Sequence, residues 1–426
     1  MEGSGRGYQL RCCGCGARYD DDGVRLDCDL AHPPALLRTV YQGKRFDPVP
    51  EPSMGRFRHW LPVRGELTTI ARTAVYQSTG IARHLGLRDL WIAFNGWWPQ
   101  RDATLVTATF KELEAVTVFA RLEPGEPRTL VVASAGNTAA AFAAVATERD
   151  APVVIVIPLD AWAPLSALVR LGPTVRVIAI QDGTYEDAIA LGKRLSACDG
   201  YVAEGGVRNI GRRDGMGTIL LSAVDAIDAL PDAYVQAVGS AAGALAAHEA
   251  ALRVIADGRF GARLPRLVLG QNAPFTPIHD AWNRFAPVLD EITPAQARER
   301  QAQIGAAVLG NPAPPYATTG GIREALAASG GRTYAIDNAG MFEAMILFAE
   351  LEGVDIEPAA GVAVATLVRA ARDGAVGRDD SVLLNVTGGG RSLRPVVGTE
   401  QRPAVVVDRA RLASLSDIGE LLSAPV

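Results

Sequence analysis

The sequence TATFKELEA, residues 107–115, decides the fold of this chain, because it places Lys111 at the start of a stretch with the composition of a helix. Three loop sequences follow it along the chain: ASAGNT at 133–138, AVGSAAGA at 237–244 and NVTGGG at 385–390. A lysine at the start of a helix means little by itself. In this order, however, a lysine, an asparagine loop, a glycine-rich loop and a threonine-glycine turn can together hold an aromatic cofactor that carries a phosphate group.

The composition is that of an ordinary globular enzyme with room for more than one core. The chain has 426 residues, of which 48% are hydrophobic and 21% charged, so we expect at least two domains. The formal net charge of −5 argues against non-specific binding of nucleic acid, which needs a basic surface. The sequence has neither a stretch of about 18 uninterrupted apolar residues nor the N-terminal pattern of a signal peptide. It therefore predicts a cytoplasmic protein that binds neither nucleic acid nor a membrane.

Short apolar runs rich in β-branched residues alternate with alanine-rich stretches from Leu130 onwards. The expected strands are 129–133, 153–157, 175–180, 234–238, 267–271, 333–336 and 382–386, and the clearest helices are 138–147 and 244–256. This alternation predicts two α/β domains with parallel sheets that face a shared cleft. The expected divisions are an N-terminal ribbon-like segment at 1–45, a larger cofactor-binding domain at 46–110 and 230–400, a smaller domain at 111–229, and a C-terminal tail at 401–426.

A glycine-rich loop lies between an expected strand and an expected helix. It consists of Gly239, Ser240, Ala241, Ala242 and Gly243. Backbone N–H groups and the positive end of the helix dipole would face an anion there, so the loop can hold a phosphate without a basic side chain. The alternative is a tight strand-to-helix turn without a ligand.

Polar side chains also follow two other expected strands. Ser134, Asn137 and Thr138 lie at the carboxyl end of the first strand, where open α/β sheets bind ligands, although Ser134 or Thr138 could instead cap the next helix. Thr387 ends an almost wholly apolar strand, and its hydroxyl is well placed to meet the nitrogen of a heterocycle. The glycines after it suggest close backbone approach, though a flexible turn would also use them. Together with Lys111, these loops predict pyridoxal 5′-phosphate as the cofactor.

Four of the five cysteines lie between residues 12 and 28. Cys12 and Cys15 have the spacing of a zinc knuckle, and Cys28 with His32 could complete a site of sulfur and nitrogen ligands. The alternative is a ribbon without metal, because His32 lies in an Ala-His-Pro-Pro loop and Cys13 is left over. We expect no metal here, and these four residues are the candidate ligands if one is bound.

Beyond these loops, the sequence resembles the threonine-synthase-like group of fold-type II pyridoxal-phosphate enzymes, whose fold is similar to that of the tryptophan synthase β subunit. Within that group it is most similar to the cysteate synthase family, from about residue 10 to residue 395. The shared stretches include Cys-Gly-Cys-Gly, Gly-Arg-Phe at 55–57, Trp-Leu-Pro-Val at 60–63, Glu-Leu-Thr-Thr at 66–69, Phe-Lys-Glu-Leu-Glu-Ala at 110–115, Gly-Met-Gly-Thr at 215–218 and Ala-Pro-Pro-Tyr at 313–316. Two of them, Trp-Leu-Pro-Val and Ala-Pro-Pro-Tyr, lie outside the cofactor loops and so indicate the subfamily. The resemblance also implies a homodimer.

The resemblance implies a transferase of amino-acid biosynthesis that replaces the phosphate of O-phospho-L-serine by sulfite and gives L-cysteate through an aminoacrylate. Lys111 would form the internal Schiff base and move the Cα proton, Asn137 would bind the ring oxygen, and residues 239–243 would hold the phosphate. Thr387 would face the pyridine nitrogen, and a neutral hydroxyl there favours β-replacement. The substrate carboxylate would be held by Ser134, Ala135, Gly136, Asn137 and Thr138.

An anionic substrate and an anionic nucleophile both call for fixed cations. Arg208, Arg212 and Arg213 form the densest basic cluster near an expected loop-to-helix junction. By itself such a cluster is typical of a solvated helix face with surface ion pairs. With the family resemblance, Arg208 and Arg212 become candidate ligands of the substrate anions.

Two departures from the family pattern surround the cofactor. The family's phosphate loop reads Gly-Ser-Gly-Thr-Gly, whereas this chain has Ala241 and Ala242 at the third and fourth positions, which removes a hydroxyl and a backbone position free to take positive φ. Thr387 stands where cysteate synthases have alanine. In this respect the chain matches the wider threonine-synthase group. The alternatives left open are another nucleophile such as sulfide, threonine synthesis from O-phosphohomoserine, or a degenerate relative that binds the cofactor without turnover.

Overall fold

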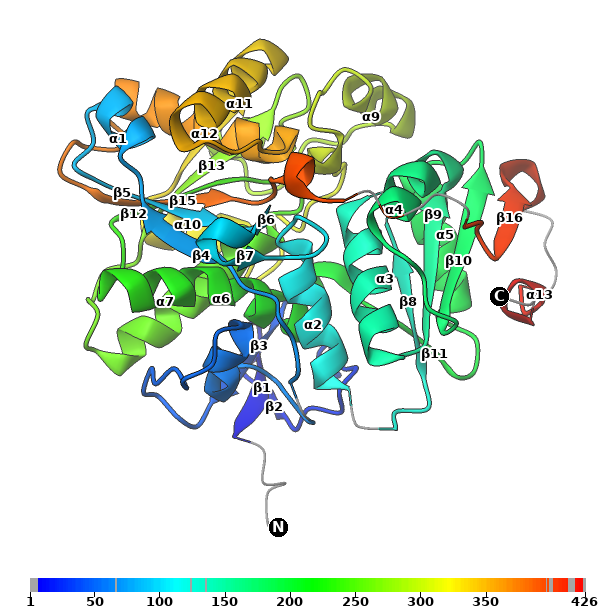
Figure 1. Cartoon of the computed structure of the whole chain (residues 1–426). Coiled ribbons are helices and arrows are strands. Elements are labelled where there is room, and N and C mark those ends of the chain that lie inside the picture. Colours follow the sequence, from blue (N-terminus) through cyan, green and yellow to red (C-terminus); the bar gives the residue numbers. More distant parts are fainter. Residues whose placement is uncertain are drawn as a thin grey trace.

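The computed structural model describes residues 7–65, 67–122, 125–134, 136–395, 397, 401–412 and 418–423. Its larger framework is a sheet that the described residues build from six strands in the order β14-β13-β12-β15-β5-β4 (Figure 1). The strands are β4 (Ala74–Gln77), β5 (Asp89–Phe94), β12 (Ala233–Ala237), β13 (Arg266–Asn272), β14 (Arg332–Ile336) and β15 (Ser381–Val386). Neighbouring strands are parallel except for β4, which pairs antiparallel with β5 at one edge.

A second sheet has five strands among the described residues, in the order β11-β8-β9-β10-β16, and all its pairs are parallel. The strands are β8 (Thr129–Ala133), β9 (Val153–Pro158), β10 (Val175–Gln181), β11 (Tyr201–Ala203) and β16 (Val405–Asp408). Residues 405–408 were expected to lie in a C-terminal tail. They instead pair with β10 and form one edge of this sheet.

Helices cover both faces of each sheet, as the alternation of strands and helices requires. They are α1 (Gly80–Leu85), α2 (Lys111–Arg121), α3 (Asn137–Arg149), α4 (Trp162–Leu168), α5 (Tyr185–Leu195), α6 (Ile210–Ile227), α7 (Ala242–Asp257), α8 (Pro277–Asn283), α9 (Pro294–Gln301), α10 (Ile322–Ser329), α11 (Asn338–Glu352), α12 (Pro358–Arg372) and α13 (Glu420–Ser423). Figure 1 shows α11 and α12 on one face of the larger sheet and α6 and α7 on the other. No helix in the described part of the chain is long and apolar enough to cross a membrane.

Alternate residues of a strand point to opposite faces, and the packing of the smaller sheet follows this rule. Val132 and Ile155 pack with α3, while Val131 and Val156 pack in a separate cluster with α5. The β16 residue Val407 joins the cluster on the α5 side. The two predicted α/β units with parallel sheets are therefore confirmed.

The ribbon is a small antiparallel sheet in the order β2-β1-β3, formed by β1 (Tyr8–Cys12), β2 (Arg18–Tyr19) and β3 (Leu37–Tyr41). In Figure 1 it lies below α2 and α6. The Tyr41 hydroxyl donates a 2.7 Å hydrogen bond to Asp214 of α6, so the ribbon is joined to that helix. The remaining short elements are the hairpin β6 (Trp97–Trp98) and β7 (Ala103–Thr104) and the 3₁₀ helices η1 (Met54–Trp60), η2 (Pro99–Arg101), η3 (Leu159–Ala161), η4 (Gly206–Arg208), η5 (Ala307–Leu309), η6 (Arg391–Leu393) and η7 (Arg409–Arg411).

His248, in the middle of α7, gives the fold a dependence on pH. Its side chain is buried, and burial together with nearby Arg38 lowers the pKa of His248 to about 4, against the opposing effect of Glu249. As the pH falls from about 6.5 to about 4, the unfolded chain gains a proton at this position while the folded chain does not. Stability is therefore lost over this window, by on the order of 3 kcal/mol from this residue.

We expect His248→Gln to flatten the fall in the free energy of unfolding between pH 6.5 and pH 4, measured by urea denaturation. His84→Gln is the matched control, because His84 is exposed on α1. If the free energy of unfolding of the His248 variant falls as steeply with pH as that of the unaltered protein, His248 does not cause this pH dependence.

Candidate active site

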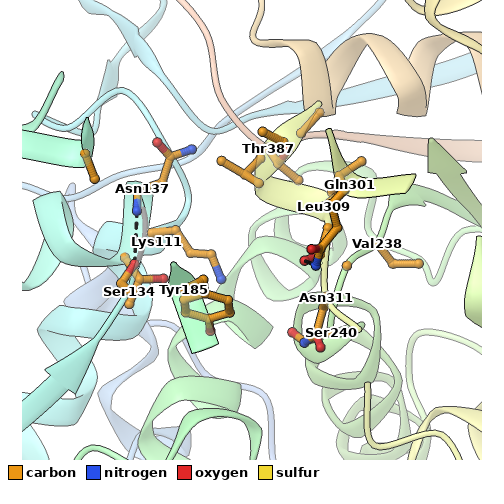
Figure 2. Close-up of a pocket in the computed structure, with 18 of the residues that line it drawn as sticks. Lys111, Ser134, Asn137, Tyr185, Val238, Ser240, Gln301, Leu309, Asn311 and Thr387 are labelled. Carbon is orange, nitrogen blue, oxygen red and sulfur yellow. Dashed lines mark hydrogen bonds between the residues drawn. The ribbon is translucent and has the colours of Figure 1, made fainter. Parts of the chain in front are cut away.

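A cavity of about 610 Å³ lies between the two sheets, where the carboxyl ends of their strands meet. Its lining includes these residues named from the sequence: Lys111, Ser134, Gly136, Asn137, Thr138, Arg212, Gly239, Ser240, Ala241, Ala242, Gly243 and Thr387. Ala135 lies outside the described residues. Figure 2 shows Lys111, Ser134, Asn137 and Tyr185 on one side and Val238, Ser240, Leu309 and Asn311 facing them across the space.

Lys111 is the only lysine among the described residues that line this cavity. It is the first residue of α2, and its Nζ lies 3.2 Å from Glu114 Oε2, one helical turn further on. Burial lowers the pKa of the Lys111 amine, and Arg212 lowers it further, while Glu114 partly opposes both. A neutral amine is therefore more accessible at this position than at an exposed lysine, which is what a nucleophile or a proton acceptor needs.

Glu114 connects Lys111 to a buried network of charges. Its Oε1 lies 2.8 Å from Arg212 Nη1 and accepts a 3.2 Å hydrogen bond from the Thr138 hydroxyl. Arg212 also binds Glu204 through two hydrogen bonds, of 2.9 Å from Nε and 2.5 Å from Nη2. Burial alone would lower the pKa of Arg212, but these carboxylates outweigh it and raise the pKa. With two carboxylates around it, Arg212 presents little net positive charge to a ligand.

The other arginine of the predicted pair lies elsewhere. Arg208 is in η4 and is absent from the described lining of the cavity. Its guanidinium lies 2.6 Å from Asp27 of the N-terminal segment, and both side chains are about half exposed. The cavity instead receives Arg298 from α9, which is exposed and has no ion pair among the described residues. No sequence pattern had singled out Arg298, because α9 carries a second exposed arginine, Arg300, and the place of Arg298 at the cavity depends on the tertiary fold.

The loop before α3 has its own internal hydrogen bonds. The Ser134 hydroxyl accepts 3.2 Å hydrogen bonds from the backbone N–H groups of Gly136, the N-cap residue of α3, and Ala139, so it satisfies two donors at the start of this helix. The Asn137 side chain donates to Glu357 at 2.9 Å and accepts from Arg391 at 3.1 Å. These contacts orient the loop, and Gly136, Asn137 and Thr138 line the cavity at the start of α3.

The glycine-rich loop is tightly packed before α7. A Cβ at Gly239 would lie 3.0 Å from the backbone oxygen of Leu309, and one at Gly243 would lie 2.7 Å from Gln236 Nε2. Ala241, between them, has φ of 61°, a left-handed conformation that costs an L residue about 1–2 kcal/mol. The loop therefore keeps the backbone turn of a glycine although the residue is alanine.

This turn gives a matched pair of variants. Ala241 and Ala242 are equally buried, but Ala242 is the first residue of α7 with ordinary helical geometry. Both variants to glycine lose one buried methyl group, and only Ala241→Gly relieves the left-handed alanine. We expect Ala241→Gly to be more stable than Ala242→Gly by on the order of 1–2 kcal/mol in urea denaturation. Equal stabilities would mean that residue 241 does not hold this conformation in solution.

Thr387 directly follows β15 and lies across the cavity from Asn137 of α3 (Figure 2). It is buried, and its hydroxyl has no hydrogen-bond partner among the residues that the structure describes. A buried hydroxyl that faces a cavity without a protein partner is suited to a polar atom of a ligand. Together with the closely packed glycines and the N-terminus of α7, it gives the cavity a fit to an aromatic ring with a phosphate arm.

Several lining residues were not identified from the sequence. They are Tyr185, Gln301, Asn311 and Glu357, in addition to Glu114 beside Lys111. Glu114 was part of the quoted stretch around Lys111, and its three-residue spacing from the lysine was the available signal. The others lie on separate loops and helices, which only the fold brings together.

Comparisons with known proteins show the family of this chain. The family model described as "Pyridoxal-phosphate dependent enzyme" matches residues 67–388. The chain is 45% identical over 388 residues to the cysteate synthase of Methanoculleus marisnigri, covering 90% of this chain and 88% of that protein. It is 47% identical over 386 residues to the cysteate synthase of Methanosphaerula palustris, covering 90% of each.

Solved structures show the same fold at low sequence identity. A fungal L-serine ammonia-lyase from Rhizomucor miehei aligns with a TM-score of 0.56 at 15% identity, covering 76% of this chain and 94% of that chain. A maize serine racemase aligns with a TM-score of 0.55 at 17% identity, covering 75% and 88% respectively. At these identities the likeness concerns the fold alone.

Proposed function

Because the chain belongs to the pyridoxal-phosphate-dependent enzymes and, within them, to the cysteate synthase family, we propose that it makes L-cysteate from O-phospho-L-serine and sulfite and releases phosphate. The observation that carries the proposal is the position of Lys111, whose amine lies in a cavity between the sheets beside Glu114. The family relation extends over nine-tenths of the chain, and the family model covers Lys111 and the cofactor loops.

The cofactor of the family is pyridoxal phosphate, and the lining residues fit it. Lys111 would be the point of covalent attachment, the N-terminus of α7 would hold the phosphate, and the Thr387 hydroxyl would meet the pyridine nitrogen. Asn137, fixed between Glu357 and Arg391, would lie at the ring oxygen. When bound, the cofactor withdraws electrons from the substrate Cα and so allows the substituent at Cβ to leave.

The Lys111 amine would hold and move the proton of the substrate Cα. Its lowered pKa makes the neutral form available, and Glu114 holds the amine in place through the 3.2 Å contact. The backbone N–H groups at the start of α3 would bind the substrate carboxylate, because Asn137 and Thr138 line the cavity there and the helix N-terminus carries the positive end of the dipole.

The anionic groups of both substrates need a further cation. Arg212 remains a candidate ligand because it lines the cavity, but Glu114 and Glu204 already balance its charge. Arg298 lines the same cavity without an ion pair among the described residues, so the proposal gives it the main contact with the phosphate or the sulfite. Arg208 has no place in this contact, since it pairs with Asp27 outside the cavity.

We expect Arg298→Ala to raise the KM for phosphoserine or sulfite by about tenfold or more, because a charge-assisted hydrogen bond contributes about 1.5–3 kcal/mol. Arg300→Ala is the matched control, since Arg300 is exposed on the same helix and does not line the cavity. The measurement is steady-state phosphate release with each substrate varied in turn. If the two variants have equal KM values for both substrates, Arg298 binds neither the phosphate nor the sulfite.

The experiment that tests the function is phosphate release from O-phosphoserine by the purified cofactor-loaded protein, with and without sulfite, followed by mass analysis of the amino-acid product. Sulfite-dependent release with cysteate as product is the expected result. The same assay is run with sulfide in place of sulfite and with O-phosphohomoserine in place of phosphoserine. Cysteine or threonine as the preferred product would replace the proposal. Absence of any release would favour a relative that binds the cofactor without turnover.

The sequence also predicts that the protein is a homodimer and that it is cytoplasmic. Both stay predictions from the sequence, and sedimentation of the purified protein measures the first.

A further inference from the structure

Three cysteines and one histidine meet in the N-terminal ribbon, outside the cavity. The ligand atoms of Cys12, Cys15, Cys28 and His32 all lie within 4.8 Å of one another. Cys12 ends β1 and Cys15 lies in the turn that follows, while Cys28 and His32 lie in the segment between β2 and β3. Two separate loops thus contribute two ligands each, which is the usual arrangement of a structural metal site.

We propose that these four residues bind one Zn²⁺ ion, although the sequence by itself favoured a ribbon without metal. In a tetrahedral site with ordinary bond lengths, two sulfur ligands are about 3.8 Å apart, and a sulfur and a nitrogen are about 3.6 Å apart. The sulfurs of Cys15 and Cys28 are 3.6 Å apart, and the Cys12 sulfur lies 3.3 Å from His32 Nε2. These separations suit ligands placed around one ion.

The same separations do not suit a disulfide. A disulfide bond needs two sulfurs about 2.05 Å apart, whereas Cys15 and Cys28 are free thiols separated by 3.6 Å. Three thiols and one imidazole also match the ligand types that Zn²⁺ prefers. Binding would release the protons of the three thiols, and neutral His32 would complete the tetrahedron.

The groups around the ligands already have the orientation that a zinc site requires. His32 Nδ1 lies 2.6 Å from the backbone oxygen of Pro33, so this nitrogen carries the proton and Nε2 is left for the metal. The backbone N–H of Gly14 donates to the Cys12 sulfur at 3.4 Å, and the Tyr19 hydroxyl lies 3.0 Å from the Cys28 sulfur. Hydrogen bonds of this kind stabilise thiolate ligands.

A glycine stands on each side of Cys15, the second ligand in the sequence. A Cβ at Gly14 would lie 2.9 Å from the Cβ of Ala35 and 3.2 Å from His32 Nδ1, so only a glycine allows the histidine ring to approach. Gly16 has φ of 76°, the left-handed conformation that closes the turn after Cys15. The Cys-Gly-Cys-Gly sequence is therefore fitted to bring the ligands together.

The ion would fix a segment that supports two helices of the active site. Asp21, between the two ligand pairs, makes a buried ion pair with Arg121 at the end of α2, at 2.7 Å. Arg121 also donates to Asn209 at 2.9 Å, and Asn209 caps α6, the helix that carries Arg212. Zinc would thus hold the ribbon against α2 and α6, so its role is structural rather than catalytic.

The first test is the metal content of the full-length protein after chelator-free purification, measured by plasma mass spectrometry. We expect about one zinc ion per chain in the unaltered protein. Cys15→Ser should lose the ion and lower the melting temperature. Cys13→Ser is the matched control, because Cys13 adjoins Cys12 but packs beside Gly320, outside the cluster, and it should keep both the ion and the stability.

A second test needs no variant and so remains informative if Cys15→Ser does not fold. Cys15 is exposed, so without a metal it should react with iodoacetamide at the same rate whether or not a zinc chelator is present. With zinc bound, peptide mapping should show slow alkylation of Cys15 that becomes fast after chelation. Cys198 is the control and should react at the same rate with and without the chelator. An unchanged Cys15 rate, iron in place of zinc, or a bond between Cys15 and Cys28 would each overturn the proposal.

Discussion

Replacing Lys111 with alanine is expected to abolish turnover while leaving the chain folded. The variant loses the only lysine among the described cavity residues, and with it the covalent attachment and the group that moves the Cα proton. Proton transfer alone contributes about 10²–10⁴-fold, so the fall in kcat should be at least about a thousandfold. The fold should survive because Glu114 keeps its partners Arg212 and Thr138.

The measurement combines steady-state rates with the visible absorbance of the bound cofactor and with urea denaturation. Lys193→Ala is the control, because Lys193 lies on α5 away from the cavity. A folded Lys111→Ala protein with undiminished activity would refute the assigned role and, with it, the proposed reaction. A variant that fails to fold would be replaced by Lys111→Gln, which keeps most of the side-chain volume.

Replacing Arg212 with alanine is expected to lower both stability and activity. The sequence together with the family resemblance made Arg212 a candidate ligand of the substrate anions. In the structure, however, the guanidinium pairs with Glu114 and Glu204, both buried, and its removal leaves two carboxylates without their main partner. Breaking a buried pair in this way costs about 3–5 kcal/mol.

Activity should change in a way that a purely structural role would not produce. Arg212 lowers the pKa of Lys111, and its loss also leaves Glu114 to pair with Lys111 alone. Both effects raise the pKa of the Lys111 amine, so the acid limb of the profile of kcat/KM against pH should move to higher pH. The profile is measured by phosphate release in overlapping buffers.

Arg208→Ala provides the control for this comparison. Arg208 is also an arginine paired with a carboxylate, but the pair with Asp27 is about half exposed and should contribute no more than about 1 kcal/mol. Its pH profile should match that of the unaltered protein. If the two variants were equally stable and had the same pH profile, the buried network around Glu114 would have no role in the site.

Much of the fold could be predicted because local signals agree with the tertiary structure. The apolar run at 153–157 has the length and β-branched content of a buried strand, and β9 spans Val153–Pro158. The edge strand β16 was missed because its four residues become a strand only by pairing with β10, more than two hundred positions earlier in the chain. Pairing between distant segments leaves no mark on local periodicity.

The sequence by itself determined the type of fold, the cofactor loops and the family, because these depend on short motifs whose backbone conformation follows from their own residues. Only the tertiary structure decided which charges meet. It paired Arg212 with two carboxylates, placed Arg208 outside the cavity and brought Arg298 into it. It also gathered Cys12, Cys15, Cys28 and His32 around one point. The physical reason is that side-chain partners are set by distances through space, which the order of residues along the chain does not contain.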